Sequence, residues 1–155
     1  MSSLQKRTWA EVSLDNISHN YRAIRAALPE GCRFLGVVKA DAYGHGAVAV
    51  ARLLESEGAD YLAVSCLDEA MELRSAGITM PLLILGHTPS EYTETLIDND
   101  ITQTVSCLAK AQEFSARAAA LGRQLRIHIK IDTGMSRLGF LCGGDSFDEG
   151  VANVI

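Results

Sequence analysis

Lys39 is the residue whose type and position most clearly suggest chemistry in this sequence. It directly follows an apolar run over residues 34–38, which is typical of a strand buried on both faces. Desolvation lowers the pKa of an amine, so a lysine at the end of such a strand can present the neutral, nucleophilic amine that forms a Schiff base. A solvated lysine just beyond a strand would produce the same local pattern, so position alone leaves both interpretations open.

Lys130 and Arg137 form a second candidate pair, near the end of a later apolar run. The guanidinium group of arginine is a planar fork of donors that suits a carboxylate. A positively charged lysine beside it would be repulsive, whereas a carbamylated lysine would carry a negative charge and attract it. On residue type alone, both could equally be ordinary polar residues near a strand end.

The cysteines and histidines give no sign of a metal or redox centre. The four cysteines lie far apart, none forms a Cys-x-x-Cys pair, and all are expected to be reduced and structural: Cys32, Cys66, Cys107 and Cys142. The histidines are equally scattered, which argues against a metal site. His45 could orient the loop after Lys39, and His128 would either face the active site or stack beneath it.

The composition is that of an ordinary globular domain. The 155 residues suit one domain with a real core, and 48% of them are hydrophobic and 21% charged. A net charge of −5 disfavours a nucleic-acid partner, because contacts to phosphates need a basic surface. No apolar run approaches the length of a membrane span, and residues 1–6 contain no apolar core of a signal peptide. The sequence therefore predicts a cytoplasmic protein.

The elements that must position these residues alternate along the chain. A short strand is predicted over residues 9–14, and Asp15 is expected to cap a helix that follows it. Five apolar runs then predict strands over residues 34–38, 61–64, 82–85, 102–105 and 126–131. Between them, helices are predicted over residues 47–57, from a capping box at 65–68 to Gly77, over 91–98 after Ser90, and from Ser106 to residue 121.

This alternation indicates parallel βαβ units and an α/β fold. Two architectures fit, an open doubly wound sheet or part of a (β/α)₈ TIM-type barrel. An open nucleotide-binding sheet would show a glycine-rich loop after an early strand, and neither G-x-G-x-x-G nor G-x-x-x-x-G-K-[ST] occurs. A barrel collects its chemistry at the carboxyl ends of several strands, which is where Lys39 and Lys130 fall. We therefore predict a partial barrel.

The residues around Lys39 narrow the interpretation. The sequence Val-Lys-Ala-Asp-Ala-Tyr-Gly-His-Gly at positions 38–46 closely resembles the pyridoxal-phosphate attachment motif of alanine racemases. The sequence His-Ile-Lys-Ile-Asp-Thr-Gly-Met-Ser-Arg-Leu-Gly-Phe at positions 128–140 resembles the same family after its fifth barrel strand. A lone Lys-Ala-Asp would suggest only the wider group that includes diaminopimelate and ornithine decarboxylases. The resemblance covers essentially the whole chain from Arg7 onward.

The resemblance implies roles for five residues. Lys39 would hold pyridoxal phosphate and act as a catalytic base. Tyr43 would contact the phosphate of the cofactor, and Leu85 would pack near its ring. Lys130 would be carbamylated and would orient Arg137, which would contact the substrate carboxylate and the phenolate oxygen of the cofactor.

For the whole protein, the resemblance implies an enzyme that interconverts L-alanine and D-alanine through a pyridoxal phosphate Schiff base and supplies D-alanine for cell-wall peptidoglycan. Residues 1–155 would be the N-terminal part of the barrel domain, with about five of its eight strands. The last barrel units and a C-terminal β-domain are expected to be absent from this chain. That β-domain supplies a second base, a tyrosine, to the partner subunit. We therefore expect a homodimer for the full-length enzyme and little activity from this chain alone.

Three alternatives stay open. A serine-preferring racemase shares these motifs. A non-catalytic barrel protein that binds pyridoxal phosphate also carries a lysine after an early strand, although such proteins lack the segments around Tyr43 and Arg137. A broken gene would yield a silent product, and the nucleotide sequence beyond residue 155 would identify it.

Overall fold

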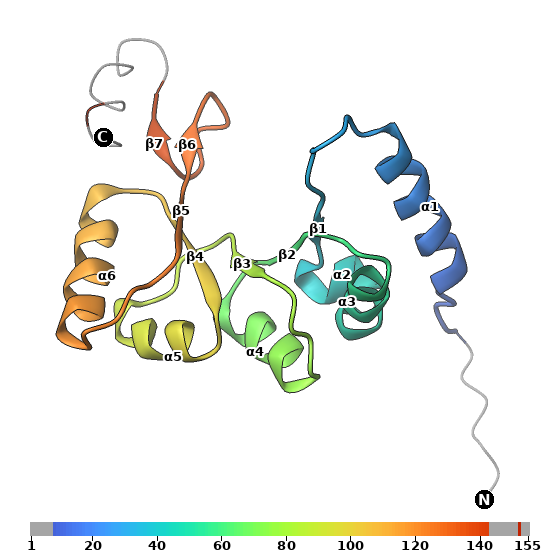
Figure 1. Ribbon diagram of the computed structural model, residues 1–155, viewed down its shortest axis with the longest axis horizontal. Helices are drawn as coiled ribbons and strands as arrows, with labels where there is room; N and C mark the ends of the chain where they lie inside the picture. Colours follow the sequence, from blue (N-terminus) through green and yellow to red (C-terminus); the bar gives the residue numbers. More distant parts are fainter. Residues whose placement is uncertain (1–7, 143–151, 153–155) are drawn as a thin grey trace, which may run out of the picture.

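The computed structural model describes residues 8–142 and residue 152. Its centre is a sheet of five parallel strands in the spatial order β1-β2-β3-β4-β5 (Figure 1). The strands span Leu35–Val37, Tyr61–Val64, Leu82–Ile84, Ile101–Val105 and Ile127–Ile129. All five predicted barrel strands are therefore present.

Helices connect consecutive strands. α3 (Ala47–Ser56) lies between β1 and β2, α4 (Leu67–Ser75) follows β2, and α6 (Leu108–Ala120) follows β4. Between β3 and β4 the chain forms a short 3-10 helix, η1 (Ser90–Tyr92), and then α5 (Thr93–Asp98). Helices α3 to α6 lie along the same side of the sheet in Figure 1. The predicted βαβ alternation is confirmed.

The strand order distinguishes the two predicted architectures. Each strand pairs in parallel with its sequence neighbours, with Leu35 opposite Tyr61 and Leu62 opposite Leu82. An open doubly wound sheet reverses its order at a switch point, whereas a barrel wall adds strands in sequence. The observed order is that of a barrel wall. It places the carboxyl ends of all five strands along one edge.

The core lies between the sheet and the helices. Its completely buried side chains come from the middle strands and from α4 and α5: Leu62, Val64, Leu82, Ile84, Leu73 and Leu96. Burial of one such side chain stabilises the fold by about 1.5–3 kcal/mol. Helix and sheet approach closely at Gly36, where an added Cβ would lie 2.7 Å from Leu54 of α3. Gly36 therefore faces the helices, and its neighbours in β1 face the other side of the sheet.

That other face is buried only in the middle of the sheet. β2 and β3 are covered on both faces, but Leu35 and Val37 of β1 are 37% and 39% exposed. At the edge of the sheet, Ile127 and Ile129 of β5 lie in register with Gln103 and Val105 on the helix-facing side, and they are 41% and 47% exposed. The prediction that the strand over residues 34–38 is buried on both faces was therefore wrong. In a closed barrel, side chains in the positions of Leu35 and Val37 pack into the interior, and the described residues form only part of the wall around it.

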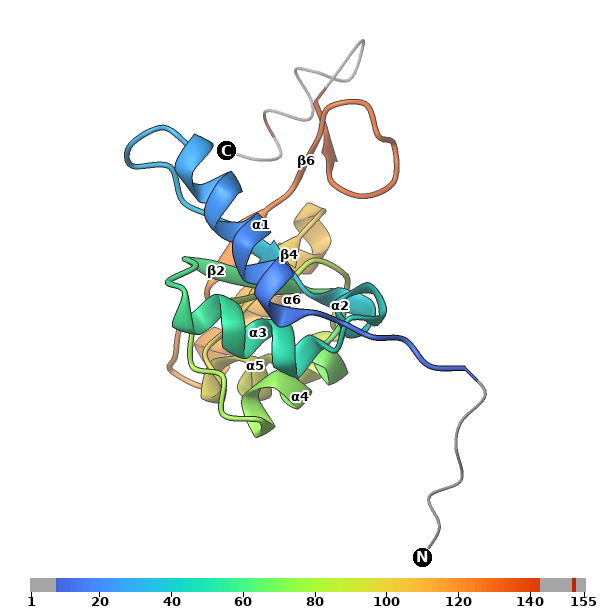
Figure 2. The ribbon, with the colours of Figure 1, turned by 90° about the vertical axis from the view of Figure 1, so that its right-hand side faces the viewer.

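The N-terminal segment differs from the prediction in two respects. Residues 8–13, expected to form most of a strand, pair with no strand in the described part of the chain, and they run away from the sheet in Figure 2. A strand needs a neighbour for its backbone hydrogen bonds, and this segment has none within reach. Helix α1 (Leu14–Ala27) begins two residues earlier than expected, because Ser13 rather than Asp15 is its N-cap and accepts a hydrogen bond from the N–H of Asn16.

The last predicted strand is divided. After β5 the ladder is interrupted at Lys130, and β6 (Ile131–Asp132) then pairs in parallel with β7 (Phe140–Leu141). The sequence did not predict this two-stranded sheet, which closes the loop between its strands. The predicted cap of α6 was also wrong by one residue, since its N-cap is Cys107.

Some features are missing from residues 8–142 and 152. None of the helices there has the length and apolar character needed to cross a membrane. No group of three or more histidine, cysteine or acidic side chains is arranged there as metal ligands would be. The four cysteines are free thiols.

Candidate active site

Lys39 lies at the carboxyl-terminal edge of the sheet, directly after β1. Val38 before it is buried, and its N–H donates to the carbonyl oxygen of Ala63 in β2 at 2.8 Å. The backbone therefore enters Lys39 as a continuation of the strand, and the lysine is half-buried at the rim. This is the position at a strand end that the sequence predicts.

The segment after Lys39 forms one turn of left-handed helix. α2 spans Lys39–Gly44, and its residues from Ala40 to Tyr43 have φ of 50–56° and ψ of 37–51°. This conformation costs a non-glycine residue roughly 1–2 kcal/mol, so four in succession store strain. The sequence predicted tight backbone geometry only at the Gly-His-Gly that follows, because glycine is the residue type that signals positive φ.

The left-handed turn brings Tyr43 beside Lys39. The Nζ atom of Lys39 lies 6.0 Å from the centre of the Tyr43 ring, close enough for attraction between an ammonium group and the aromatic face. Tyr43 is 61% exposed. The two side chains that the sequence singled out in this motif therefore lie together at the rim and are open to a ligand.

Two side chains of the same loop support the turn. The carboxylate of Asp41 accepts a hydrogen bond from the N–H of Ala47 at 2.6 Å, which ties the turn to the first residue of α3. The backbone carbonyl of Asp41 accepts from the N–H of Gly46 at 2.9 Å. The Nδ1 atom of His45 lies 2.9 Å from the carbonyl oxygen of Ala42, so His45 braces the loop.

Glu69 of α4 connects the turn to the neighbouring strand. One carboxylate oxygen accepts from the N–H of Ala40 at 2.8 Å, and the other accepts from the N–H and the hydroxyl of Ser65, each at 2.7 Å. Burial alone would raise the pKa of the Glu69 carboxyl group. The hydrogen bonds from Ser65 and Ala40, together with the charge of Lys39, outweigh burial and hold that pKa below its usual value.

The sequence prediction missed Glu69. It paired Ser65 with Asp68 in a capping box, but the N-cap of α4 is Cys66, whose side chain makes no cap hydrogen bond. Glu69 stands three residues after this N-cap, which is the position from which an acidic side chain reaches back over the first turn. The sequence therefore contained a local signal for the contact between Glu69 and Ser65, one residue after the predicted Asp68, but none for the contact with Ala40.

Leu85 follows β3 and lies at the same edge of the sheet. Its N–H donates to the carbonyl oxygen of Val64 at 2.8 Å. Its side chain is partly exposed and lines a small cavity together with Thr104 and with Leu138 of the later loop. The hydroxyl of Thr104 is buried and has no hydrogen-bond partner in the part of the chain that the structure describes. Because buried hydroxyls are usually paired, this cavity suits a polar group.

Lys130 and Arg137 lie at the far end of this edge, after β5. The N–H of Lys130 donates to the carbonyl of Val105 at 2.9 Å, and its own carbonyl accepts from the N–H of Phe140 at 2.8 Å. Lys130 is half-buried, whereas Arg137 is exposed. Both side chains carry hydrogen-bond donors only, so a direct hydrogen bond between them needs an acceptor such as a carbamate on Lys130. The structure places the two residues at the two ends of one loop.

Asp132, at the end of β6, shapes the loop that carries Arg137. It is 4% exposed, and one carboxylate oxygen accepts from the N–H groups of Gly134 and Ser136, each at 3.0 Å. These hydrogen bonds are the main cause of a lowered pKa for its carboxyl group, against the opposing effect of burial. The sequence prediction also passed over Asp132.

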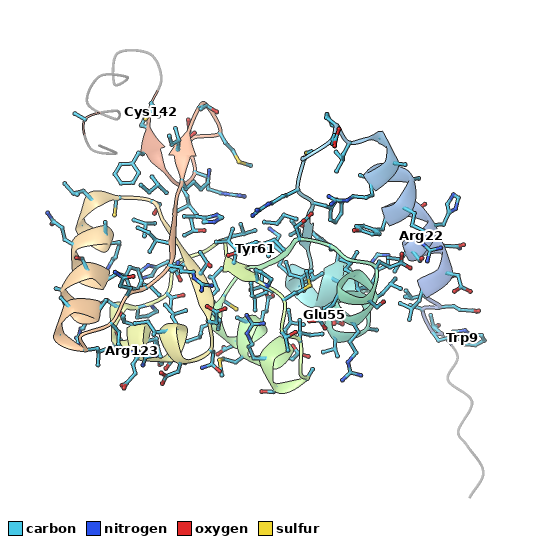
Figure 3. The ribbon with its side chains drawn as sticks, viewed as in Figure 1. Trp9, Arg22, Glu55, Tyr61, Arg123 and Cys142 are labelled. Carbon is cyan, nitrogen blue, oxygen red and sulfur yellow. The ribbon has the colours of Figure 1, made fainter. Side chains whose placement is uncertain are left out.

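Tyr61 and His128 lie away from this edge. Tyr61, labelled in Figure 3, begins β2, and its hydroxyl oxygen lies 2.5 Å from that of Thr102 in β4. The ring centres of Tyr61 and His128 are 5.8 Å apart. Because this contact is at the amino-terminal end of β2, His128 stacks beneath the candidate site, which is one of the two positions left open by the sequence.

Comparisons with known proteins match this chain to alanine racemases over most of its length. The family model described as "Alanine racemase, N-terminal domain" matches residues 12–152. The alanine racemase of Desulfosudis oleivorans is 47% identical over 131 residues, which are 84% of this chain and 34% of that protein. The alanine racemase of Clostridium perfringens is 51% identical over 133 residues, 86% of this chain and 34% of that protein. The chain thus spans about a third of the length of the curated relatives it matches.

Solved structures show the same wall. An alanine racemase of Clostridium difficile 630 superimposes with a TM-score of 0.87 at 47% identity, covering 98% of this chain and 39% of that one. The alanine racemase of Bacillus anthracis with bound L-Ala-P gives a TM-score of 0.82 at 34% identity, over 99% of this chain and 40% of that one. A histidine racemase from Leuconostoc mesenteroides gives 0.75 at 29% identity, over 83% and 34% of the two chains. The five-stranded sheet therefore matches part of the TIM-type barrel of these enzymes.

Proposed function

The chain belongs to the alanine racemase N-terminal-domain family, and from that premise we propose that the protein interconverts L-alanine and D-alanine with pyridoxal phosphate attached to Lys39. The observation that carries this proposal is the position of Lys39. It follows a buried residue at the carboxyl end of β1, and its amine lies beside the exposed ring of Tyr43. Chemistry in a barrel belongs at this end of the strands.

The side chains at this edge suit pyridoxal phosphate. The amine of Lys39 can bind an aldehyde covalently, and the exposed phenol of Tyr43 can donate a hydrogen bond to a phosphate. Leu85 offers an aliphatic surface to a ring. The hydroxyl of Thr104, which has no hydrogen-bond partner within the described residues, lines the same cavity. When bound, the cofactor supplies an electron sink for charge that develops at the α-carbon of the substrate.

The remaining roles are assigned to residues of this chain by their chemistry. Lys39 is proposed to take the α-proton on one face of the substrate and to return it there in the reverse direction. Arg137 is proposed to bind the substrate carboxylate, because its guanidinium forms paired hydrogen bonds with such a group. Lys130, carbamylated and therefore negative, is proposed to orient Arg137.

Proton transfer on the opposite face requires a second base. We assign it to a tyrosine from a partner subunit of a homodimer, outside this chain. We further propose that the enzyme works in the cytoplasm and supplies D-alanine for cell-wall peptidoglycan. In the domain organisation that this implies, residues 1–155 are the N-terminal part of a barrel domain, and the chain alone has little activity.

Covalent labelling tests the proposal at Lys39. The purified protein is incubated with pyridoxal phosphate, reduced with borohydride and digested, and the modified lysine is located by mass spectrometry. We expect the label on Lys39 in the unchanged protein and its loss from that peptide in Lys39→Ala. Equal labelling of the Lys39→Ala variant would exclude this lysine as the attachment site.

A substrate panel tests the reaction itself. With the natural protein that contains this sequence, we expect exchange of the α-proton of alanine for deuterium, followed by loss of optical activity. Serine belongs in the panel because a serine-preferring racemase shares these motifs, and histidine belongs there because the similar enzyme from Leuconostoc is a histidine racemase. Labelling of Lys39 without proton exchange for any of them would instead support a non-catalytic protein that binds pyridoxal phosphate.

A further inference from the structure

The carboxylate of Glu69 bridges the ends of two neighbouring barrel strands. One oxygen accepts from the N–H of Ala40, two residues after the buried Val38, and the other accepts twice from Ser65, directly after β2. We propose that Glu69 is a positioning residue, which holds the left-handed turn after Lys39 against the neighbouring strand and so fixes the lysine for cofactor attachment. This inference rests on the proposed role of Lys39.

The turn needs restraint from outside. Four successive non-glycine residues, from Ala40 to Tyr43, adopt a left-handed conformation that free peptide avoids. Strain of this kind persists only where the surroundings over-determine it. Asp41 and His45 brace the turn from within its own loop, so they shape it without anchoring it to the adjacent βα unit. Among the described hydrogen bonds that involve side chains, the one that Glu69 accepts from the N–H of Ala40 connects the turn to α4.

Glu69 stands on a rigid base. It lies in the first turn of α4, where the helix dipole favours a negative charge. The neighbouring residues Ala70 and Leu73 are completely buried, so the helix is firmly seated on the sheet. The carboxylate therefore has a fixed origin, and its two oxygens have fixed partners.

The contact acts directly on the backbone of Lys39. On one side, the N–H of Val38 donates to Ala63 in β2. On the other side, the N–H of Ala40 belongs to the peptide group that begins at the carbonyl carbon of Lys39, and it donates to Glu69. The backbone of the lysine is thus held between two hydrogen bonds, one on each side, which fix the point and direction from which its side chain leaves the rim.

Glutamine at this position separates positioning from general stability. Glu69→Gln keeps the shape and one acceptor oxygen, but its amide nitrogen cannot accept from the second partner, so one side of the bridge is lost. The matched control is Glu72→Gln on the same helix. Glu72 is exposed, and its carboxylate makes no hydrogen bond within the described residues.

The experiment uses the natural protein that contains this sequence, with two readouts. Amide hydrogen exchange without added cofactor is followed in the peptide that covers residues 39–46. Binding of pyridoxal phosphate to Lys39 is followed by its absorbance and by borohydride labelling. For Glu69→Gln we expect faster exchange confined to residues 39–46 and about tenfold weaker cofactor binding, and for Glu72→Gln no change in either.

Ser65→Ala supplies a second, milder variant. It removes the hydroxyl donor on one oxygen and leaves both backbone donors in place, so we expect a smaller effect in the same peptide. If Glu69→Gln does not fold, the comparison of Ser65→Ala with Glu72→Gln decides in its place. The proposal would be supported if Ser65→Ala showed faster exchange at residues 39–46 and weaker cofactor binding while Glu72→Gln showed neither.

The outcomes distinguish this inference from the proposed function. Absence of label on Lys39 in the unchanged protein would overturn the role of the lysine. Label on Lys39 together with equal behaviour of Glu69→Gln and Glu72→Gln would overturn the role of Glu69 alone. Faster exchange spread over the whole chain in Glu69→Gln, with unchanged cofactor binding, would also overturn it, because that pattern belongs to a residue needed only for stability.

Discussion

The turn after Lys39 and the loop that carries Arg137 lie at opposite ends of one sheet edge and are held in different ways. The Lys39 turn is fixed from outside, because Glu69 of the next βα unit accepts a hydrogen bond from the N–H of Ala40. The Arg137 loop is fixed from within, since Asp132 accepts two hydrogen bonds from N–H groups of its own loop. By the hydrogen bonds of these two carboxylates, one loop is therefore anchored to its neighbour and the other to itself.

The difference follows from the places of β1 and β5 in the sheet. The unit after β1 lies beside it, so a side chain from α4 reaches the Lys39 turn. β5 has a neighbour on one side only within the described residues, so its loop depends on its own hydrogen bonds. Lys39 is half-buried and Arg137 is exposed, in agreement with this contrast. We expect the lysine to be preorganised in this wall and the arginine to reach its working position only as the rest of the site assembles.

The largest effect should come from the anchored end. Lys39→Ala removes both the proposed attachment point and the proposed base, and we expect kcat/KM for alanine racemisation to fall at least about a thousandfold. Circular dichroism should show an unchanged fold. Lys130→Ala serves as the comparison from the other end, and a larger loss there than in Lys39→Ala would reverse the roles assigned to the two loops.

A smaller loss is expected from the substrate-binding residue. Arg137→Lys keeps the charge but removes the paired hydrogen bonds of the guanidinium fork, so kcat/KM should fall about a hundredfold. Labelling of Lys39 by pyridoxal phosphate and borohydride should remain, because the anchored end does not depend on this arginine. Loss of labelling in Arg137→Lys would show that the two ends are not independent.

The βαβ framework was predictable because it depends on local patterns. Apolar runs at regular spacing located all five strands, and the absence of glycine-rich nucleotide motifs favoured a barrel over an open sheet. The exposure of Leu35 and Ile127 was not predictable, since burial of an edge strand depends on what lies opposite it. An apolar run looks the same in a middle strand and in an edge strand.

The site was predictable in its positions but not in its supports. Lys39 and Arg137 stood out because their motifs are continuous in sequence. Glu69 acts across 29 residues on Ala40, and no local spacing reveals such a contact. The left-handed turn was not predicted for a related reason. Its residues have no intrinsic preference for positive φ, and tertiary contacts impose this conformation on them.

Asp132→Asn should loosen the self-supported loop and spare the anchored one. The amide oxygen of asparagine is a weaker acceptor than the carboxylate for the N–H groups of Gly134 and Ser136. We expect cleavage by trypsin after Arg137 to be about tenfold faster than in the unchanged protein, with unchanged cleavage after Lys39. Equal acceleration at both sites would show that the loops share one support.

Acid provides an independent check on the same residue. The folded-state pKa of Asp132 is lowered, so its contribution to loop order is complete above the unfolded pKa of about 3.9 and is lost as pH falls through the lower, folded-state value. Protection of residues 133–139 against hydrogen exchange should therefore persist near neutral pH and decline below about pH 4. In Asp132→Asn this decline should be smaller.

The smallest effect concerns the cavity between the two ends. Leu85 follows β3 and lines this cavity with Leu138 of the Arg137 loop, so a cofactor bound at Lys39 would lie against a surface to which both ends contribute. Leu85→Ala should weaken binding of pyridoxal phosphate about threefold, because only part of one aliphatic side chain is lost from the contact. The matched control is Leu83→Ala in the same strand, which removes a buried side chain and should lower the free energy of unfolding by about 2–5 kcal/mol while leaving cofactor affinity unchanged. Equal weakening of affinity in both variants would mean that Leu85 acts through the stability of β3 and not through contact with the cofactor.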